Sequence, residues 1–171
     1  MSVSLAVKYR PKTFDQVCSQ SSVIKILQRQ LDLRKFTNCY LFAGPSGTGK
    51  TTVGRIFANE INNHKGEPIE IDGASNGTVE AVRAIIDSAN ERSIDSEYKI
   101  FIVDEAHMLS IQAWNAFLKC LEEPPRYTIF IFCTTNPEKI PETIQNRLMR
   151  LNISKVAYDF ITERLKFICK E

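Results

Sequence analysis

The feature that most constrains the fold of this chain is the stretch CYLFAGPSGTGKTT at residues 39–52. A short apolar run at 40–43 is followed at once by GPSGTGKT, which fits the pattern G-x-x-x-x-G-K-[ST] at every required position. Glycines allow backbone conformations that are closed to residues with a Cβ, so successive N–H groups can turn toward a triphosphate. The pattern therefore predicts a phosphate-binding loop between a buried strand and a helix.

Each part of this loop has an expected role. Lys50 is expected to neutralise the β- and γ-phosphates of ATP, and the Thr51 hydroxyl to bind Mg²⁺. A helix expected over 51–61 adds its positive N-terminal end to the anion site. A glycine-rich turn that binds nothing is the alternative, which the context of strand, loop and helix disfavours. Thr52 is expected on the core side of that helix. The predicted nucleotide-binding residues of the loop are Gly44, Pro45, Ser46, Gly47, Thr48, Gly49, Lys50, Thr51 and Thr52.

A second informative stretch is KIFIVDEAH at 99–107. Four consecutive apolar residues predict a strand that is buried on both faces of a parallel sheet, and two acids follow it. In P-loop ATPases an acid at this place holds Mg²⁺ and the next one orients the attacking water. Asp104 is thus the predicted magnesium ligand and Glu105 the predicted catalytic base. The alternative, that both acids only cap a helix, is disfavoured by the loop about fifty residues upstream.

Strand and helix patterns alternate along the chain, which predicts an α/β fold of the P-loop NTPase type. We expect a three-layer sandwich around a five-stranded parallel sheet, with nucleotide at the carboxyl ends of the strands. Residues 8–13 are expected to form an extended arm, and Ser21 and Thr78 to cap helices. Trp114 is expected to pack in the core. Strands are predicted at 40–43, 69–72, 100–103, 127–134 and 149–153, and helices at 22–33, 51–61, 78–92, 111–121, 140–148 and 158–171.

Composition adds limits on the class of protein. A net charge of +2 does not by itself indicate a nucleic-acid binder, and 171 residues suffice for one domain with a proper core. The five cysteines are odd in number and show no C-x-x-C spacing, so we expect small core residues in a reducing compartment. The chain opens on no secretory leader pattern and has no apolar run of membrane-spanning length, which predicts a cytoplasmic protein without a membrane partner. The cysteines are Cys18, Cys39, Cys120, Cys133 and Cys169.

Several stretches together resemble a known family. KYRPKTFDQV, GPSGTGKTT, VDEAHMLS and AFLKCLEEPP are similar to the clamp-loader branch of the AAA+ ATPases. With TTNPEKIP added, they most resemble the gamma/tau family of bacterial DNA polymerase III subunits, over about residues 5–155. The resemblance implies an AAA+ ATP-binding domain over 1–155, followed by the truncated start of a helical lid over 156–171. A bacterial and a phage source both stay open.

The resemblance assigns further site residues. The arm that contains Arg10 and Pro11, with Val17 after it, lines the adenine pocket in this family. The second threonine of the TT pair stands at the sensor position, which implies Thr135, with Thr134 as the alternative.

An arginine finger is also implied. In the family a Ser-Arg-Cys motif reaches the ATP of the neighbouring subunit, and here Asn146-Arg147-Leu148 keeps only the arginine. The alternative is a surface arginine that caps a helix C-terminus. The predicted catalytic set is thus Lys50, Glu105, Thr135 and Arg147.

The function that the resemblance implies is ATP-driven loading of a sliding clamp onto primer-template DNA during replication. Its partners would be other clamp-loader subunits in a hetero- or homo-oligomeric ring, the clamp and the DNA, and its cofactors ATP and Mg²⁺. Relatives carry a four-cysteine zinc module after the P-loop helix, but residues 59–68 hold no cysteine, so no zinc is expected. The alternatives are a structural or regulatory ring subunit without turnover and another AAA+ DNA-processing ATPase, such as a branch-migration motor.

Overall fold

Five parallel strands form a single sheet in the computed structural model, which describes residues 4–17 and 20–170. The strand order is β2-β3-β4-β1-β5, and every neighbouring pair is parallel. The predicted five-stranded parallel sheet is therefore confirmed. The strands are β1 Cys39–Ala43, β2 Ile69–Asp72, β3 Lys99–Asp104, β4 Thr128–Thr134 and β5 Met149–Asn152.

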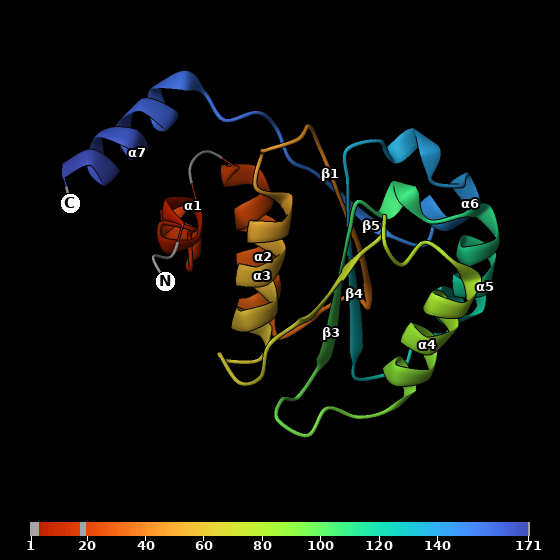
Figure 1. Cartoon of the computed structure of the whole chain (residues 1–171). Helices are drawn as coiled ribbons and strands as arrows, with labels where there is room; N and C mark the ends of the chain where they lie inside the picture. The colour runs from red at the N-terminus through yellow and green to blue at the C-terminus, as the bar shows by residue number, and fades with distance from the viewer. Residues whose placement is uncertain (1–3, 18–19, 171) are drawn as a thin grey trace.

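Helices cover both faces of the sheet and give the three predicted layers (Figure 1). Helices α2 and α3 lie on one face, and α4, α5 and α6 lie on the other. The helices are α1 Leu5–Lys8, α2 Ser21–Leu33, α3 Lys50–Ile61, α4 Val79–Asn90, α5 Ile111–Glu122, α6 Glu142–Gln145 and α7 Tyr158–Lys170, with short 3₁₀ turns η1 Phe14–Gln16, η2 Ala106–Met108 and η3 Pro137–Lys139.

The central strands are apolar except at their ends, because each of their faces packs on a helical layer. Successive side chains of a strand point to opposite faces, so the sheet separates two cores. Trp114 of α5 is 1% exposed and its ring lies 5.2 Å from that of Phe132, as expected for a core residue. On the other face the rings of Tyr40 and Phe57 are 5.3 Å apart. The two cores together fix the sheet whose carboxyl edge carries the site.

The N-terminal part of the chain departs from its prediction in two places. Lys8 ends helix α1 and is not part of an extended arm, because Pro11 restricts only the residue directly before it. Ser21 is the first residue of α2 and does not cap it. Gln20 stands before the helix with a left-handed φ of 59°, and its side chain bonds to the backbone of Ser154 after β5. This tie to the edge of the sheet sets where α2 begins.

Two other helix ends can be compared with the sequence. The Thr78 hydroxyl accepts a hydrogen bond from Ala81 N at 3.3 Å, which confirms the predicted cap of α4. Helix α6 begins later than the predicted 140–148, because Pro141 disfavours a helical conformation at Ile140, which is extended with φ -85° and ψ 130°. Beyond α6 the N–H groups of Arg147 and Leu148 bond three residues back, as in a 3₁₀ turn.

The burial of each cysteine depends on whether its element packs on the sheet. Cys39, Cys120 and Cys133 are buried, as predicted. Cys169 is exposed, so its predicted core position is wrong, because α7 lies away from the sheet. Cys18 lies outside the described residues. Within residues 4–17 and 20–170, no helix combines the length and the apolar character needed to cross a membrane.

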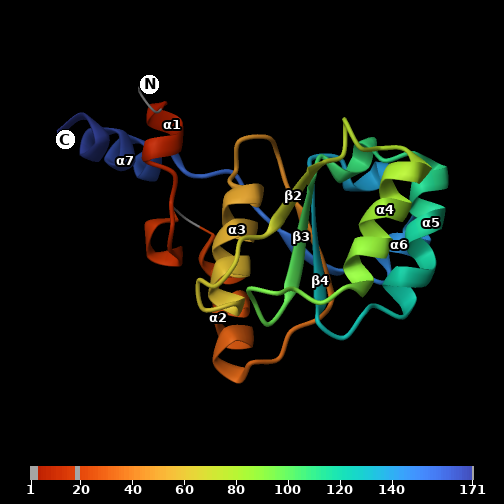
Figure 2. The ribbon, with the colours of Figure 1, turned by 60° about the horizontal axis from the view of Figure 1, so that its bottom comes forward.

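Helix α7 lies beside α1, at a distance from the sheet, in both Figure 1 and Figure 2. The guanidinium of Arg164 donates a hydrogen bond to Tyr9 O at 3.1 Å, which joins segments at opposite ends of the described chain. The two end segments thus meet next to the N-terminal end of α3, where the phosphate-binding loop lies.

Candidate nucleotide-binding site

The loop at 44–49 joins β1 to α3 at the carboxyl edge of the sheet. Gly47 and Gly49 have φ values of 72° and 90°, which residues with a Cβ rarely adopt. A Cβ at Gly44 would lie 2.0 Å from the carbonyl oxygen of Ile153. The glycines of the pattern are therefore required by the path of the backbone.

Lys50 places a positive charge inside this loop. Its side chain is buried, and its Nζ donates hydrogen bonds to the carbonyl oxygens of Gly44 at 3.0 Å and Pro45 at 2.9 Å. The hydroxyl of Thr48 donates to the same Pro45 oxygen at 2.8 Å. An ammonium group has three donors, so Lys50 keeps one for a further acceptor. A buried cation at the N-terminal end of a helix favours an anion such as phosphate.

The predicted metal ligands are brought together across 53 residues of sequence. Thr51 Oγ1 donates a hydrogen bond to Asp104 Oδ2 at 2.6 Å, and Asp104 Oδ1 accepts one from Glu105 N at 2.9 Å. A hydroxyl and a carboxylate oxygen are ligands that Mg²⁺ prefers, and this ion takes its other ligands from phosphate and water. The pair therefore fits magnesium, although no cluster of three or more His, Cys, Asp or Glu that could hold a metal occurs among the described residues.

Glu105 is held in an unusual backbone conformation directly after β3. Its φ and ψ are 46° and 43°, a left-handed conformation that costs a residue with a Cβ about 1 kcal/mol or more. A Cβ at Gly73 would lie 2.8 Å from the carbonyl oxygen of Glu105, so the segment after β2 packs tightly against it. The carboxylate itself is 40% exposed and faces the cavity described below.

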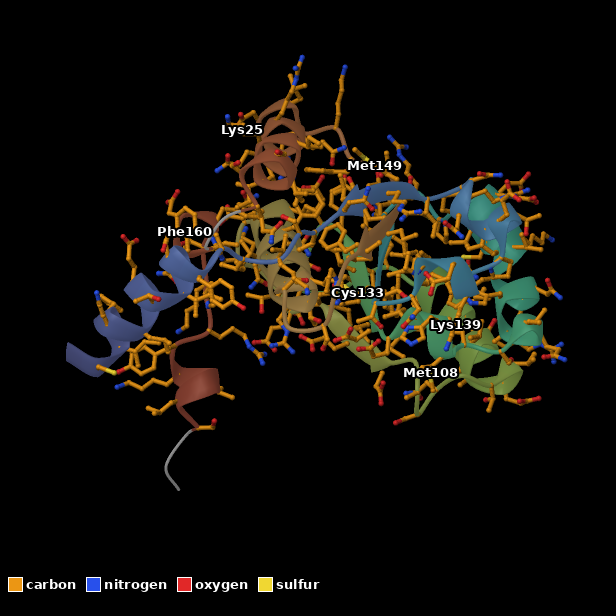
Figure 3. The ribbon with its side chains drawn as sticks, turned by 90° about the horizontal axis from the view of Figure 1, so that it is seen from above. Lys25, Met108, Cys133, Lys139, Met149 and Phe160 are labelled. Carbon is orange, nitrogen blue, oxygen red and sulfur yellow. The ribbon has the colours of Figure 1, made fainter. Side chains whose placement is uncertain are left out.

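Both threonines of the pair at the end of β4 lie near this carboxylate. Thr135 Oγ1 is 3.4 Å from Glu105 Oε2, so the predicted sensor residue contacts the predicted base directly. Thr134 is fully buried, and its hydroxyl lies 3.1 Å from Nδ1 of His107. His107 was not among the predicted site residues, and its only sequence signal is its place after the two acids. Figure 3 looks onto this edge of the sheet, with Cys133, the residue before the pair, near its middle and Met108 toward the rim.

Two adjoining cavities open at this edge. The polar cavity, of about 570 Å³, is lined by the loop, by both acids and by Arg55. The apolar cavity, of about 500 Å³, lies between the arm, the loop and α7, and Arg10, Pro11 and Val17 all line it. Arg10, Gly47, Gly49 and Thr52 line both cavities, so the two are continuous.

Thr52 corrects one expectation. It is only half-buried and faces both cavities, although it was expected on the core side of α3. The core side of this helix is occupied by Val53, Ile56 and Phe57.

Arg147 lies away from both cavities. Its guanidinium forms an ion pair with Glu122 at the end of α5 and donates a hydrogen bond to Thr143 O in α6. Its side chain is 33% exposed. The fold thus brings together every predicted site residue except Arg147.

Comparison with known proteins identifies the family. Residues 68–157 match the family described as DNA polymerase III, delta subunit, and so cover more than half of the chain. The chain belongs to this family. A DNA polymerase III tau subunit from Bacillus subtilis is 41% identical over 94% of the chain and 32% of its own length. A gamma/tau subunit from Mycoplasma genitalium is 37% identical over 96% of the chain and 31% of its own length. The chain thus spans about a third of these relatives.

Solved structures place this DNA polymerase III family member in a wider fold. A gamma-subunit-related protein from Thermotoga maritima aligns with a TM-score of 0.68 and 24% identity, over 78% of this chain and 47% of its own. A variant of the RuvB protein from the same organism aligns with a TM-score of 0.77 and 22% identity, over 93% and 53%. At such identities the likeness shows the fold alone, which is that of a P-loop NTPase.

Proposed function

We propose that the chain is the ATP-binding and ATP-hydrolysing region of a clamp-loader subunit of DNA polymerase III. The observation that carries this proposal is the 2.6 Å hydrogen bond between Thr51 and Asp104, with Glu105 next in the chain. This bond joins the phosphate-binding loop to the acids at the end of β3, the arrangement that phosphoryl transfer to water requires. Family membership supplies the link to replication.

The side chains of the polar cavity divide the work of hydrolysis. The loop amides and Lys50 would hold the phosphates, and Thr51 with Asp104 would hold Mg²⁺, which neutralises charge on the phosphate oxygens when it is bound. Glu105 would accept a proton from the attacking water, because its carboxylate is exposed to the cavity that the phosphates would fill. Thr135 would help to fix that carboxylate.

The apolar cavity is proposed to hold the adenine ring. The arm residues Arg10, Pro11 and Val17 form one wall, and α7 forms another with Leu165 and Ile168. Pockets for flat apolar rings are lined in this way by apolar side chains with few polar groups. Residues 1–155 would then be the ATPase domain, and 156–171 the first part of a lid over the base.

Arg147 is proposed to act on the nucleotide of a neighbouring subunit. It lines neither cavity of its own chain, and Glu122 of α5 and Thr143 of α6 fix its guanidinium in the helical layer. Such a finger neutralises charge in the transition state. A ring of subunits, a sliding clamp and primer-template DNA are its proposed partners, and the cytoplasm its proposed location.

A structural ring subunit that binds nucleotide without turnover is the second candidate. The complete set of Lys50, Asp104 and Glu105 favours hydrolysis over that alternative. The likeness to RuvB shows the fold alone and does not favour branch migration.

The proposal is tested by measuring ATP turnover per chain against protein concentration, with and without primed DNA and a sliding clamp. Arg147→Ala is compared with Arg150→Ala, an exposed arginine on β5 that serves as a matched control. We expect turnover per chain to rise with concentration and with DNA and clamp, and Arg147→Ala to lower it by about 10³-fold.

Two results would contradict this proposal. Turnover that does not vary with concentration and is unaffected by Arg147→Ala would exclude a shared site and leave a self-contained ATPase. ATP binding without turnover, unchanged by Glu105→Gln, would favour the structural subunit.

A further inference from the structure

His107 lies beside the proposed catalytic base in a partly buried position. Its side chain is 9% exposed, and its Nδ1 is 3.1 Å from Thr134 Oγ1 and 3.3 Å from Glu105 Oε2. One ring nitrogen therefore contacts both the end of β4 and the carboxylate that follows β3. The residues of the proposed hydrolysis do not include His107.

The direction of the hydrogen bonds follows from the chemistry of the three groups. An ionised carboxylate can only accept, so the contact with Glu105 is favourable when Nδ1 carries a proton. Thr134 Oγ1 already accepts a bond from Asn136 N at 3.1 Å and has a second lone pair for the imidazole. With a proton on Nδ1, the imidazole can donate to Thr134 Oγ1 at 3.1 Å and attract Glu105 Oε2 at 3.3 Å.

Thr135 alone does not hold the Glu105 carboxylate firmly in one direction. Its hydroxyl has one proton, and the nearer acceptor is Asn136 Oδ1 at 2.8 Å, whereas Glu105 Oε2 lies at 3.4 Å. The imidazole Nδ1 lies 3.3 Å from the same oxygen, and the side chain of His107 is only 9% exposed. His107 is therefore a second group within reach of this carboxylate oxygen.

Hydrogen bonds fix the backbone around Glu105, whereas the direction of its side chain needs further contacts. Its carbonyl accepts a bond from Met108 N at 2.8 Å, and the carbonyl of Asp104 accepts one from Gly73 N at 2.8 Å. Because these bonds fix the left-handed turn, the direction of the carboxylate depends on the partners of its oxygens. The carboxylate is 40% exposed, so without a donor it would sample several rotamers.

We propose that His107 is a positioning residue, which holds the Glu105 carboxylate against the end of β4 through a proton on Nδ1. This inference rests on the proposed ATPase function and names a residue that orients its base. Loss of the imidazole would lower the rate of hydrolysis without weakening nucleotide binding, since His107 lines neither cavity.

The first test measures which ring nitrogen of His107 carries the proton. The chain has two histidines, so His64→Gln leaves His107 as the only imidazole. Nitrogen-15 NMR at about pH 8, where an ordinary imidazole is neutral, reports which ring nitrogen carries the proton. We expect protonated Nδ1, with a changed signal in Glu105→Ala. A bare Nδ1, or a signal indifferent to Glu105→Ala, would overturn the proposal.

The second test uses substitutions that keep or move the donor. In His107→Asn the amide nitrogen stands at the same number of bonds from Cα as Nδ1, whereas in His107→Gln it stands one bond further out. We expect Asn to retain kcat within about threefold, and Gln and Leu to lose about 10- to 100-fold, with nucleotide affinity changed by less than about twofold. A purely structural role predicts that all three variants lose melting temperature, affinity and rate together, and that result would overturn the proposal.

The two tests separate this inference from the function on which it rests. If the unmodified chain shows no turnover under any condition, the ATPase proposal fails, and the NMR signal still decides the contact between His107 and Glu105. If turnover is present but His107→Asn is as slow as His107→Leu, the ATPase proposal stands and the role of His107 is wrong.

Discussion

The two adjoining cavities of this site are built in different ways. The polar cavity is formed by a continuous loop and the end of the adjacent buried strand, and Lys50, Thr51 and Asp104 all have hydrogen-bond partners there. The apolar cavity is formed by three segments, two of which lie at opposite ends of the chain. Its wall residues Leu5 and Leu165 are 66% and 56% exposed.

This difference indicates a division between affinity and selectivity. The polar cavity rests on a sheet that is packed on both faces, so its groups are fixed before phosphate binds. The apolar cavity depends on the contact between α1 and α7, which includes the bond from Arg164 to Tyr9. We expect the polar cavity to provide most of the binding energy and the apolar cavity to recognise the base.

The largest effect is expected from Lys50→Ala, which removes the buried cation of the polar cavity. Affinity for ATP and for inorganic tripolyphosphate should fall equally, by about 100-fold, because a charge-assisted bond to phosphate is worth about 2–3 kcal/mol. Titration calorimetry measures both ligands, with the exposed Lys65→Ala as a control. A loss below about threefold for tripolyphosphate would show that the loop amides suffice without this lysine.

A smaller and selective effect is expected from Leu165→Asp, which places a carboxylate in the wall of the apolar cavity. ATP affinity should fall about tenfold, because the base would lose apolar contact and meet a charge. Tripolyphosphate affinity should stay the same. Ile161→Asp is the matched control, since Ile161 is exposed on the same helix but does not line the cavity. Equal losses for both ligands would contradict the proposed division.

The same contrast explains what the sequence could predict. The requirements of the polar cavity are local, because the glycines, Lys50 and Thr51 are adjacent and each residue type has one chemical reason to be there. The strand that carries Asp104 and Glu105 was recognisable because burial on both faces demands an unbroken apolar run. Sheet, layers and phosphate-binding loop therefore followed from pattern alone.

What the sequence did not predict depends on contacts between distant segments. The tie from Gln20 to Ser154 sets the start of α2, and a helical pattern contains no information about it. The burial of Cys169 was predicted from its apolar neighbours, but α7 does not pack on the sheet. The role of His107 depends on its contacts with Thr134 and Glu105, which lie at the ends of different strands. Such roles appear only when the strands are placed side by side.

The smallest expected effect is a change in how stability depends on pH, caused by the buried thiol of Cys39 in the sheet beneath the polar cavity. Cys39 begins β1, the strand that leads into the loop, and burial raises the pKa of its thiol from 9.0 to about 12, with a further contribution from Cys120. Because the folded pKa lies above the unfolded one, this thiol costs no stability below about pH 9, and stability falls as the pH rises from about 9 toward 12. At about pH 9.5 the loss in the free energy of unfolding is about 1 kcal/mol.

Urea unfolding at pH 8 and 9.5 should therefore show a smaller pH-dependent loss of stability in Cys39→Ala than in the unmodified chain. Cys169→Ala controls for removal of an exposed thiol. The cavity left by the alanine lowers stability equally at both pH values, so only the difference between them reports the thiol. An identical loss in Cys39→Ala and the unmodified chain would mean that the thiol of Cys39 is not shielded from water in the folded protein.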